Sequence, residues 1–144
     1  MIVKIAVSWR NGASDIIGWS IISGNVDYIG TTWTASDGNR SIDLNGLVAG
    51  TISQSINTVD GSAYQVLFDM ATNPGYTGLD RIVRLGVSAA GETTAYSFDI
   101  SGKTGVDMGW EQKSFVFTAT GTTSTLTFKS TIAGAGGPAL DNVR

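Results

Sequence analysis

The sequence contains no cysteine and no histidine. Without cysteine, the chain has no disulfide framework, no thiolate nucleophile and no thiolate ligands for zinc or iron–sulfur clusters. Without histidine, it lacks the commonest general base and the commonest ligand of transition metals, which excludes Ser-His and Cys-His triads. Both absences favour binding over catalysis, so we predict that the protein is not an enzyme.

Charge and long apolar runs are scarce too. Charged residues make up 15% of the chain and the net charge is −3, which leaves no excess of basic side chains to release counterions from phosphates. We therefore expect no nucleic-acid partner. No stretch reaches the roughly 20 apolar residues of a membrane-spanning helix, so no membrane span is expected. Residues 1–8 are too short an apolar segment for a secretory signal peptide, and we predict none.

The residues that are present indicate strands rather than helices. The chain has 144 residues, of which 42% are hydrophobic, 19 are glycine and 2 are proline. This length fits a single domain spanning residues 1–144, with enough apolar surface for a core. Apolar residues recur with a period of two, as in Ala63–Ala71, where Tyr64 and Phe68 share one face and Gln65 and Asp69 the other.

Around ten short segments of this kind are separated by turn dipeptides such as Asn45-Gly46 and Asp60-Gly61. The predicted strands are Ile2–Ser8, Trp19–Ile22, Val26–Ile29, Ser41–Leu44, Thr51–Ile56, Ala63–Ala71, Arg81–Ser88, Thr93–Ile100, Gln112–Thr118, Ser124–Lys129 and Ala139–Val143. The predicted core residues are Tyr64, Val66, Phe68, Leu85, Phe98, Phe115, Phe117, Leu126 and Phe128. The pattern predicts an all-β protein with an antiparallel jelly-roll β-sandwich.

Several motifs in order carry a resemblance to a known family. They are Ile17-Gly-Trp19, Gly24-Asn-Val-Asp-Tyr-Ile-Gly30, Ala35-Ser-Asp-Gly-Asn-Arg-Ser-Ile-Asp-Leu-Asn-Gly46, Thr51-Ile-Ser-Gln-Ser-Ile56, Asp107-Met-Gly-Trp110 and Gly137-Pro-Ala-Leu-Asp-Asn-Val143. Together they resemble the bacterial choice-of-anchor C domain, which is akin to the DUF642 proteins of plant cell walls. That resemblance implies a galactose-binding-like jelly roll.

The resemblance also implies a location and a general function. It implies an extracellular or cell-surface, non-catalytic domain related to carbohydrate-binding modules, with a polysaccharide or other glycan as its partner. Residues 1–13 lack the Asn-Gly-Ser-Phe-Glu-like first strand of the family, and no sorting segment follows Arg144. We therefore expect both termini to be trimmed or replaced relative to the family.

The candidate sugar site begins in the predicted strand Val26–Ile29 and continues through the loop that follows it. Sugar sites need a flat aromatic ring and polar side chains that pair with neighbouring hydroxyl groups. The residues that supply this inventory are Tyr28, Trp33, Asp37, Asn39 and Arg40. The alternative is that Asp37-Gly-Asn39 forms a tight turn and that Arg40 pairs with Asp43 or Asp27.

Other aromatic and polar residues are secondary candidates. Trp110 ends a polar loop and is either an exposed stacking platform for a sugar or an aromatic closing one end of the sandwich. Trp19 opens a strand and is predicted to pack in the core or at its rim. Ile52 and Ile56 are expected to face the core, and Gln54 between them is predicted to face outward or to lie at a sheet edge, as a second-rank binding residue.

Asp141 is the candidate metal ligand. Related carbohydrate-binding jelly rolls often hold a structural Ca²⁺ between an acidic residue near the first strand and an aspartate near the last, and the resemblance assigns Asp141 the second role. Calcium requires six to eight oxygen ligands, and the N-terminal glutamate is absent here. The alternative is that Asp141 caps a turn or accepts bonds from backbone amides.

Two function classes remain open after catalysis is set aside. A glycosidase needs two carboxyl groups roughly 5–10 Å apart, and the chain has only two glutamates, Glu92 and Glu111, neither beside another acid. The competing class to sugar binding is a structural or adhesive domain that forms a homodimer through an exposed sheet edge. A solvent-open groove lined by Trp33 and Arg40 would favour sugar binding, and a buried Trp33 would favour the structural class.

Overall fold

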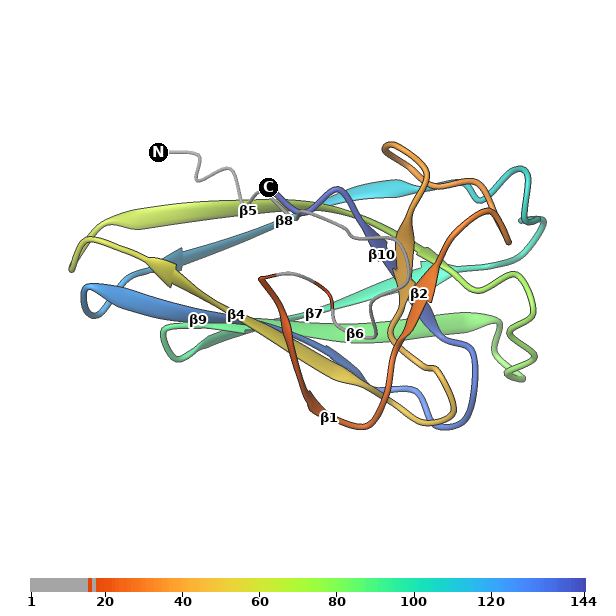
Figure 1. Cartoon of the computed structure of the whole chain (residues 1–144), viewed down its shortest axis with the longest axis horizontal. Helices are drawn as coiled ribbons and strands as arrows, with labels where there is room; N and C mark the ends of the chain where they lie inside the picture. The colour runs from red at the N-terminus through yellow and green to blue at the C-terminus, as the bar shows by residue number, and fades with distance from the viewer. Residues whose placement is uncertain (1–15, 17) are drawn as a thin grey trace.

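The computed structural model describes residues 16 and 18–144, so the predicted strand Ile2–Ser8 lies outside the described residues. The described chain forms ten strands (Figure 1). They are β1 (Ser20–Ser23), β2 (Asp27–Ile29), β3 (Ser41–Asp43), β4 (Thr51–Asn57), β5 (Ala63–Thr72), β6 (Ile82–Ala89), β7 (Glu92–Asp99), β8 (Glu111–Thr118), β9 (Thr123–Ser130) and β10 (Pro138–Asp141). No helix long and apolar enough to cross a membrane occurs among these described residues.

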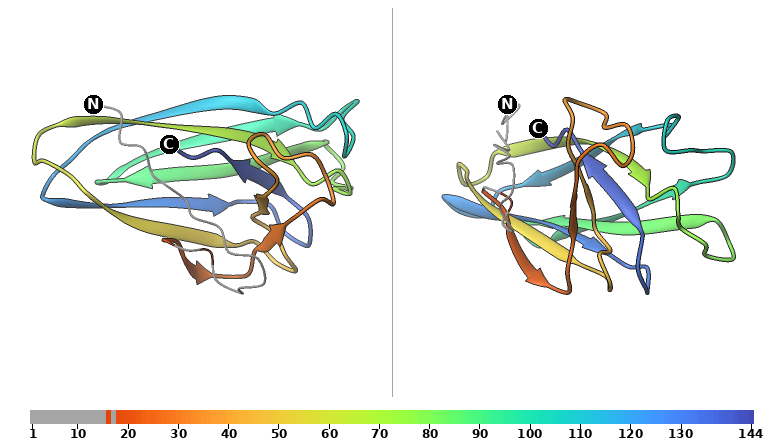
Figure 2. Two further views of the ribbon diagram at one scale, coloured as in Figure 1. Left: turned by 45° about the horizontal axis from the view of Figure 1, so that its top comes forward. Right: turned by 45° about the vertical axis from the view of Figure 1, so that its right-hand side comes forward.

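The strands form two antiparallel sheets of five strands each. One sheet has the order β1-β4-β9-β6-β7 and the other has the order β2-β3-β10-β5-β8. In Figures 1 and 2 the two sheets lie one over the other, with β5 and β8 in one layer and β4, β9 and β6 in the other. This arrangement confirms the prediction of an all-β sandwich with jelly-roll architecture.

The core lies between the sheets and is built by the alternation seen in the sequence. On β5, Val66, Phe68 and Met70 are buried, and the Phe68 ring meets the Phe128 ring of the opposite sheet edge-on, with 5.1 Å between centroids. The nine core residues predicted from the sequence are all buried. Period-two alternation therefore identified the inner face correctly, because successive side chains of a strand point to opposite faces.

The outward face of the second sheet carries three aspartates that are nevertheless buried. Because Phe68 points inward, its neighbour Asp69 points outward, and Asp69 pairs across strands with Asp141. In the same way Ala139 pairs with Asp43, which shares that outward face. The exposed fractions of Asp43, Asp69 and Asp141 are 0%, 8% and 4%. Loops must therefore cover this part of the sheet.

The long edge strand β8 is protected by side chains from β7 of the other sheet. The Thr118 backbone N–H donates to Glu92 Oε1 at 2.8 Å, and Tyr96 Oη donates to the Ser114 carbonyl at 2.7 Å. These contacts use backbone groups that a further strand would need. They close one side of the sandwich and make this part of β8 a poor site for strand pairing with a second copy.

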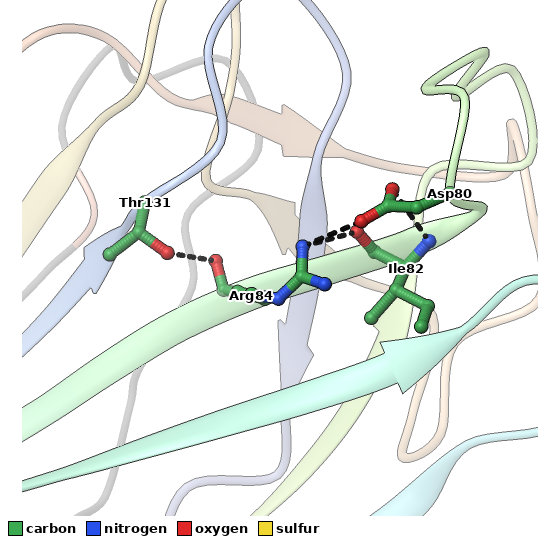
Figure 3. Close-up of polar contacts among 4 residues, drawn as sticks. All are labelled: Asp80, Ile82, Arg84 and Thr131. Carbon is green, nitrogen blue, oxygen red and sulfur yellow. Dashed lines mark hydrogen bonds and ion pairs between the residues drawn. The ribbon is translucent and has the colours of Figure 1, made fainter.

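A polar cluster fixes the turn that leads into β6 (Figure 3). Arg84 Nη1 lies 2.9 Å from Asp80 Oδ2. The backbone carbonyl of Arg84 accepts a hydrogen bond from Thr131 Oγ1 at 3.2 Å. The hydrogen bond from Arg84 lowers the pKa of Asp80. Both side chains of the ion pair are about half exposed, so the pair positions the turn and adds little to stability.

Candidate functional site

The loop at residues 30–40, between β2 and β3, folds over the outward face of its own sheet. Trp33 is the hydrophobic centre of this loop, with 4% of its surface exposed. Its Nε1 donates to Ser41 Oγ at 2.8 Å in a buried hydrogen bond. Trp33 therefore does not present an open ring face to solvent, and of the two outcomes considered for this residue the buried one is observed.

Two contacts connect the same loop to the segment between β7 and β8. The Thr34 N–H donates to the Gly105 carbonyl at 2.9 Å, and the Thr34 carbonyl accepts a bond from Trp110 Nε1, also at 2.9 Å. Trp110 is partly buried and packs against the core. The Trp110 indole thus holds the loop in place. This is closer to the predicted role of an aromatic residue that closes one end of the sandwich than to that of an exposed stacking platform.

A pocket of about 410 Å³ lies between these two loops. It is lined by Gly30, Thr31, Thr32, Trp33, Thr34, Ala35, Gly38, Asn39, Thr104, Gly105 and Val106. Among the described residues, the lining offers threonine hydroxyls, one side-chain amide and backbone groups, and no charged side chain. Such a surface can donate hydrogen bonds to the hydroxyl groups of an uncharged ligand and accept hydrogen bonds from them.

The other predicted sugar-site residues lie around this pocket rather than in its lining. The Arg40 guanidinium carbon lies 5.2 Å from the centroid of the Tyr28 ring, a cation–π arrangement. Arg40 also borders the pocket, since a Cβ placed on Gly30 would lie 2.8 Å from its Nη1. Asp37 is exposed, and its backbone amide bonds to Asp141. Of the predicted set, the structure brings Trp33 and Asn39 together at the pocket.

Asp141 accepts hydrogen bonds at both carboxylate oxygens. Its Oδ2 accepts the backbone N–H groups of Ser36 at 2.7 Å and Asp37 at 2.9 Å, and its Oδ1 accepts the N–H of Asn142 at 2.7 Å. Burial raises the pKa of Asp141, and these three bonds oppose that rise. Asp141 thus accepts hydrogen bonds from backbone amides, which was the alternative to calcium binding considered for this residue.

The described residues around Asp141 do not form a calcium site. Within the described residues, no group of three or more acidic side chains is placed to hold a metal ion. N–H donors aim at both oxygens of Asp141, and an N–H group facing the carboxylate occupies the direction that a cation would need. Calcium favours six to eight oxygen ligands, and the part of the chain that the structure describes places no acidic cluster around Asp141 that could contribute them.

Melting in the presence of calcium tests this mismatch. We expect millimolar Ca²⁺ and a chelator to give the same melting temperature, because a ligand stabilises a protein only if the native state binds it. Differential scanning calorimetry of the wild type and of Asp141→Ala is the measurement. A melting temperature that rises with calcium in the wild type and not in Asp141→Ala would establish the metal site.

Sequence reasoning missed several residues of the site. Thr31, Thr32 and Thr104 line the pocket, and Ser36 and Asp69 hold its loop. The threonines gave no signal because exposed threonine is common in β proteins. Asp69 occupies an outward position of a core strand, where an acidic side chain normally faces water.

The prediction for Gln54 is wrong. Gln54 lies on the same face of β4 as Ile52 and Ile56, because residues two apart share a face, and β4 lies between β1 and β9, not at an edge. Its Oε1 is buried and has no hydrogen-bond partner among the described residues. Gln54 therefore belongs to the inner face and is not a candidate for surface binding.

The two five-stranded antiparallel sheets define a jelly-roll β-sandwich, the fold that several solved carbohydrate-binding modules also have. A family model described as "Protein of unknown function (DUF642)" matches residues 3–144. The chain belongs to this family, which confirms the resemblance carried by the sequence motifs.

Comparison with other proteins gives one sequence relative and several similar structures. Halomucin from Haloquadratum walsbyi is 34% identical over 131 residues, which cover 89% of this chain and 1% of the relative. The xylan-binding family 22 module from Paenibacillus barcinonensis superposes with a TM-score of 0.60 at 18% identity, covering 88% of this chain and 83% of that one. A family 61 module solved with β-1,4-galactotriose gives 0.56 at 14% identity, covering 88% and 86%.

Proposed function

We propose that the chain is a non-catalytic carbohydrate-binding domain of a secreted or surface protein, and that it binds a glycan in the pocket between residues 30–40 and 104–106. The observation that carries this proposal is the pocket itself, whose side chains are hydroxyls, one amide, Trp33, Ala35 and Val106. The similarity to carbohydrate-binding modules supports the same class of ligand. A polysaccharide would enter through one or two of its sugar units.

An uncharged sugar fits this pocket best. No lysine, arginine, aspartate or glutamate of residues 18–144 lines it, so a uronate would meet no cation of this part of the chain in the lining. Arg40 borders the pocket beside Gly30, and a longer ligand that carries a carboxylate would meet it there. In that case Arg40→Lys weakens binding, because lysine lacks the planar fork of the guanidinium group.

Calorimetric titration tests the proposed site. Each hydrogen bond to a solvated pocket contributes only about 0.5–1.5 kcal/mol, so we expect a Kd on the order of 0.01–1 mM for a binding oligosaccharide. The Kd should change little with salt, because the pocket lining is uncharged. The probes are xylo-oligosaccharides and β-1,4-galactotriose, with a galacturonan oligosaccharide as the charged comparison.

A pair of asparagine variants locates the site. Asn39→Ala removes the one amide side chain of the lining and should raise the Kd about tenfold or more. Asn57→Ala removes an exposed amide at the end of β4 and should leave the Kd unchanged. Equal affinity in wild type and Asn39→Ala would place binding elsewhere, and no binding to any glycan on an array would refute the proposed function.

The second candidate is a structural or adhesive domain without a sugar site. The burial of Trp33 favours it, because the open aromatic surface expected of a sugar platform is absent at that residue. A homodimer through a sheet edge would use an edge other than the protected part of β8, and β1, a four-residue edge strand with Ile22 57% exposed, is the candidate. Light scattering of the purified domain distinguishes a monomer from this dimer.

A further inference from the structure

Asp69 and Asp141 hold the loop that forms most of the pocket. They pair across β5 and β10 on the outward face of the sheet, and the loop at residues 30–40 covers both. Ser36 contributes its backbone N–H to Asp141 Oδ2 at 2.7 Å and its hydroxyl to Asp69 Oδ2. One serine therefore bonds two carboxylates that lie far from it in the sequence.

The burial of the Asp69 and Asp141 carboxylates destabilises the fold unless both carboxylates accept hydrogen bonds. Removing a carboxylate from water carries a large penalty that only hydrogen bonds or opposite charges offset. Asn142 provides two further donors, its backbone N–H to Asp141 Oδ1 at 2.7 Å and its Nδ2 to Asp69 Oδ2 at 3.0 Å. The remaining donors come from Ser36 and Asp37, so a loop that moved away would leave the carboxylates under-satisfied.

From this geometry we propose that Asp69 and Asp141 form a carboxylate clamp that fixes residues 36–37, and that they are positioning residues for the ligand pocket rather than calcium ligands. Lining residues lie on both sides of the clamped pair, with Thr31, Thr32 and Thr34 before it and Gly38 and Asn39 after it. A loop that is already ordered avoids an entropy cost on binding. The part of this inference that concerns ligand affinity rests on the proposed function.

Amide hydrogen exchange measured by NMR tests the clamp without any ligand. The variants are Asp141→Asn, which removes one acceptor oxygen, and Ser36→Ala, which removes only the hydroxyl bond to Asp69. Asp60→Asn, in an exposed turn, is the matched control. We expect exchange at Ser36 and Asp37 to accelerate about tenfold in Asp141→Asn, less in Ser36→Ala, and not at all in the control.

Affinity is measured on the same variants with xylo-oligosaccharides or β-1,4-galactotriose, whichever binds the wild type. We expect the Kd to rise about tenfold in Asp141→Asn, while the exchange of core amides in β5 and β6 stays close to that of the wild type. Accelerated exchange throughout the sheets would indicate a general loss of stability, and Ser36→Ala, which leaves both carboxylates in place, then decides whether the effect is confined to the loop.

Three results would overturn the proposal, the first two by removing the clamp and the third by removing its link to the pocket. The first is wild-type exchange at Ser36 and Asp37 in both Asp141→Asn and Ser36→Ala. The second is exchange at these amides that slows when calcium is added to the wild type and recovers with a chelator, which would make the carboxylates metal ligands. The third is unchanged affinity despite faster exchange, which would remove the link to the pocket. If no sugar binds, the proposed function fails, and the exchange data still decide whether the clamp holds the loop.

Discussion

Trp33→Ala is expected to lower the free energy of unfolding by about 3–5 kcal/mol, the usual cost of deleting a large buried aromatic side chain. The reason is that the indole fills the space between the loop at residues 30–40 and the sheet, where only 4% of the residue is exposed. The substitution also leaves Ser41 Oγ without its donor. Since Trp33 lines the pocket, sugar affinity should fall together with stability.

Urea unfolding and calorimetric titration, run in parallel, measure both effects. Trp33→Phe is the matched variant, because it keeps an aromatic ring and removes the hydrogen bond to Ser41. We expect it to cost about 1–2 kcal/mol, the scale of one buried hydrogen bond with modest repacking. An unchanged urea midpoint in Trp33→Ala would mean that the indole is not buried. Loss of binding at an unchanged midpoint would return Trp33 to the role of an exposed sugar platform.

The strands could be predicted because their information is local. Alternation with a period of two defines an inner face wherever one side of a strand is buried, and glycine-containing turns separate the strands. Gly61 shows this well: its φ of 76° lies in the left-handed region, and it follows Asp60 in the turn between β4 and β5. The predicted strand Ser41–Leu44 and the observed β3 accordingly differ by one residue at the C-terminal end.

The environment of the outward face could not be predicted in the same way. Alternation places Asp69 outward but does not say whether water or a loop lies above it. The loop above Asp69 comes from a segment 33 positions away, and Asp141 contacts the same loop across 105 positions. For the same reason Trp33, in a loop of polar residues, carried no sign of burial. Contacts of this length depend on how the sheets assemble, which no short pattern encodes.

Asp43 illustrates a second consequence of covering the outward face with loops. It is fully buried, and its carboxylate accepts bonds from the backbone N–H groups of Asn45 at 2.8 Å and Gly137 at 3.1 Å and from Asn73 Nδ2 at 2.8 Å. Burial raises the pKa of Asp43 from 3.8 to about 6, against the three donors, which lower it. The negative charge of Asp27, opposite Asp43 on β2, adds to the rise.

The raised pKa of Asp43 makes stability depend on pH with a defined sign. Between pH 4 and pH 6 the native state binds a proton at Asp43 that the unfolded chain has released, so this contribution to stability is full below about pH 3.8 and is lost as the pH rises through about 6. A shift of this size corresponds to about 3 kcal/mol. We therefore expect the free energy of unfolding to fall by about that amount across this interval because of Asp43 alone.

Asp43→Asn should abolish this part of the pH dependence, because an amide does not titrate. The substitution should also lower the free energy of unfolding at every pH. The new NH₂ group must face either Asn73 Nδ2 or the backbone N–H groups, which now donate hydrogen bonds to the carboxylate oxygens. Urea unfolding of the wild type, Asp43→Asn and the exposed control Asp60→Asn at pH 4 and pH 7 gives the comparison. The same pH slope in wild type and Asp43→Asn would show that the three N–H donors outweigh burial and keep Asp43 ionised throughout.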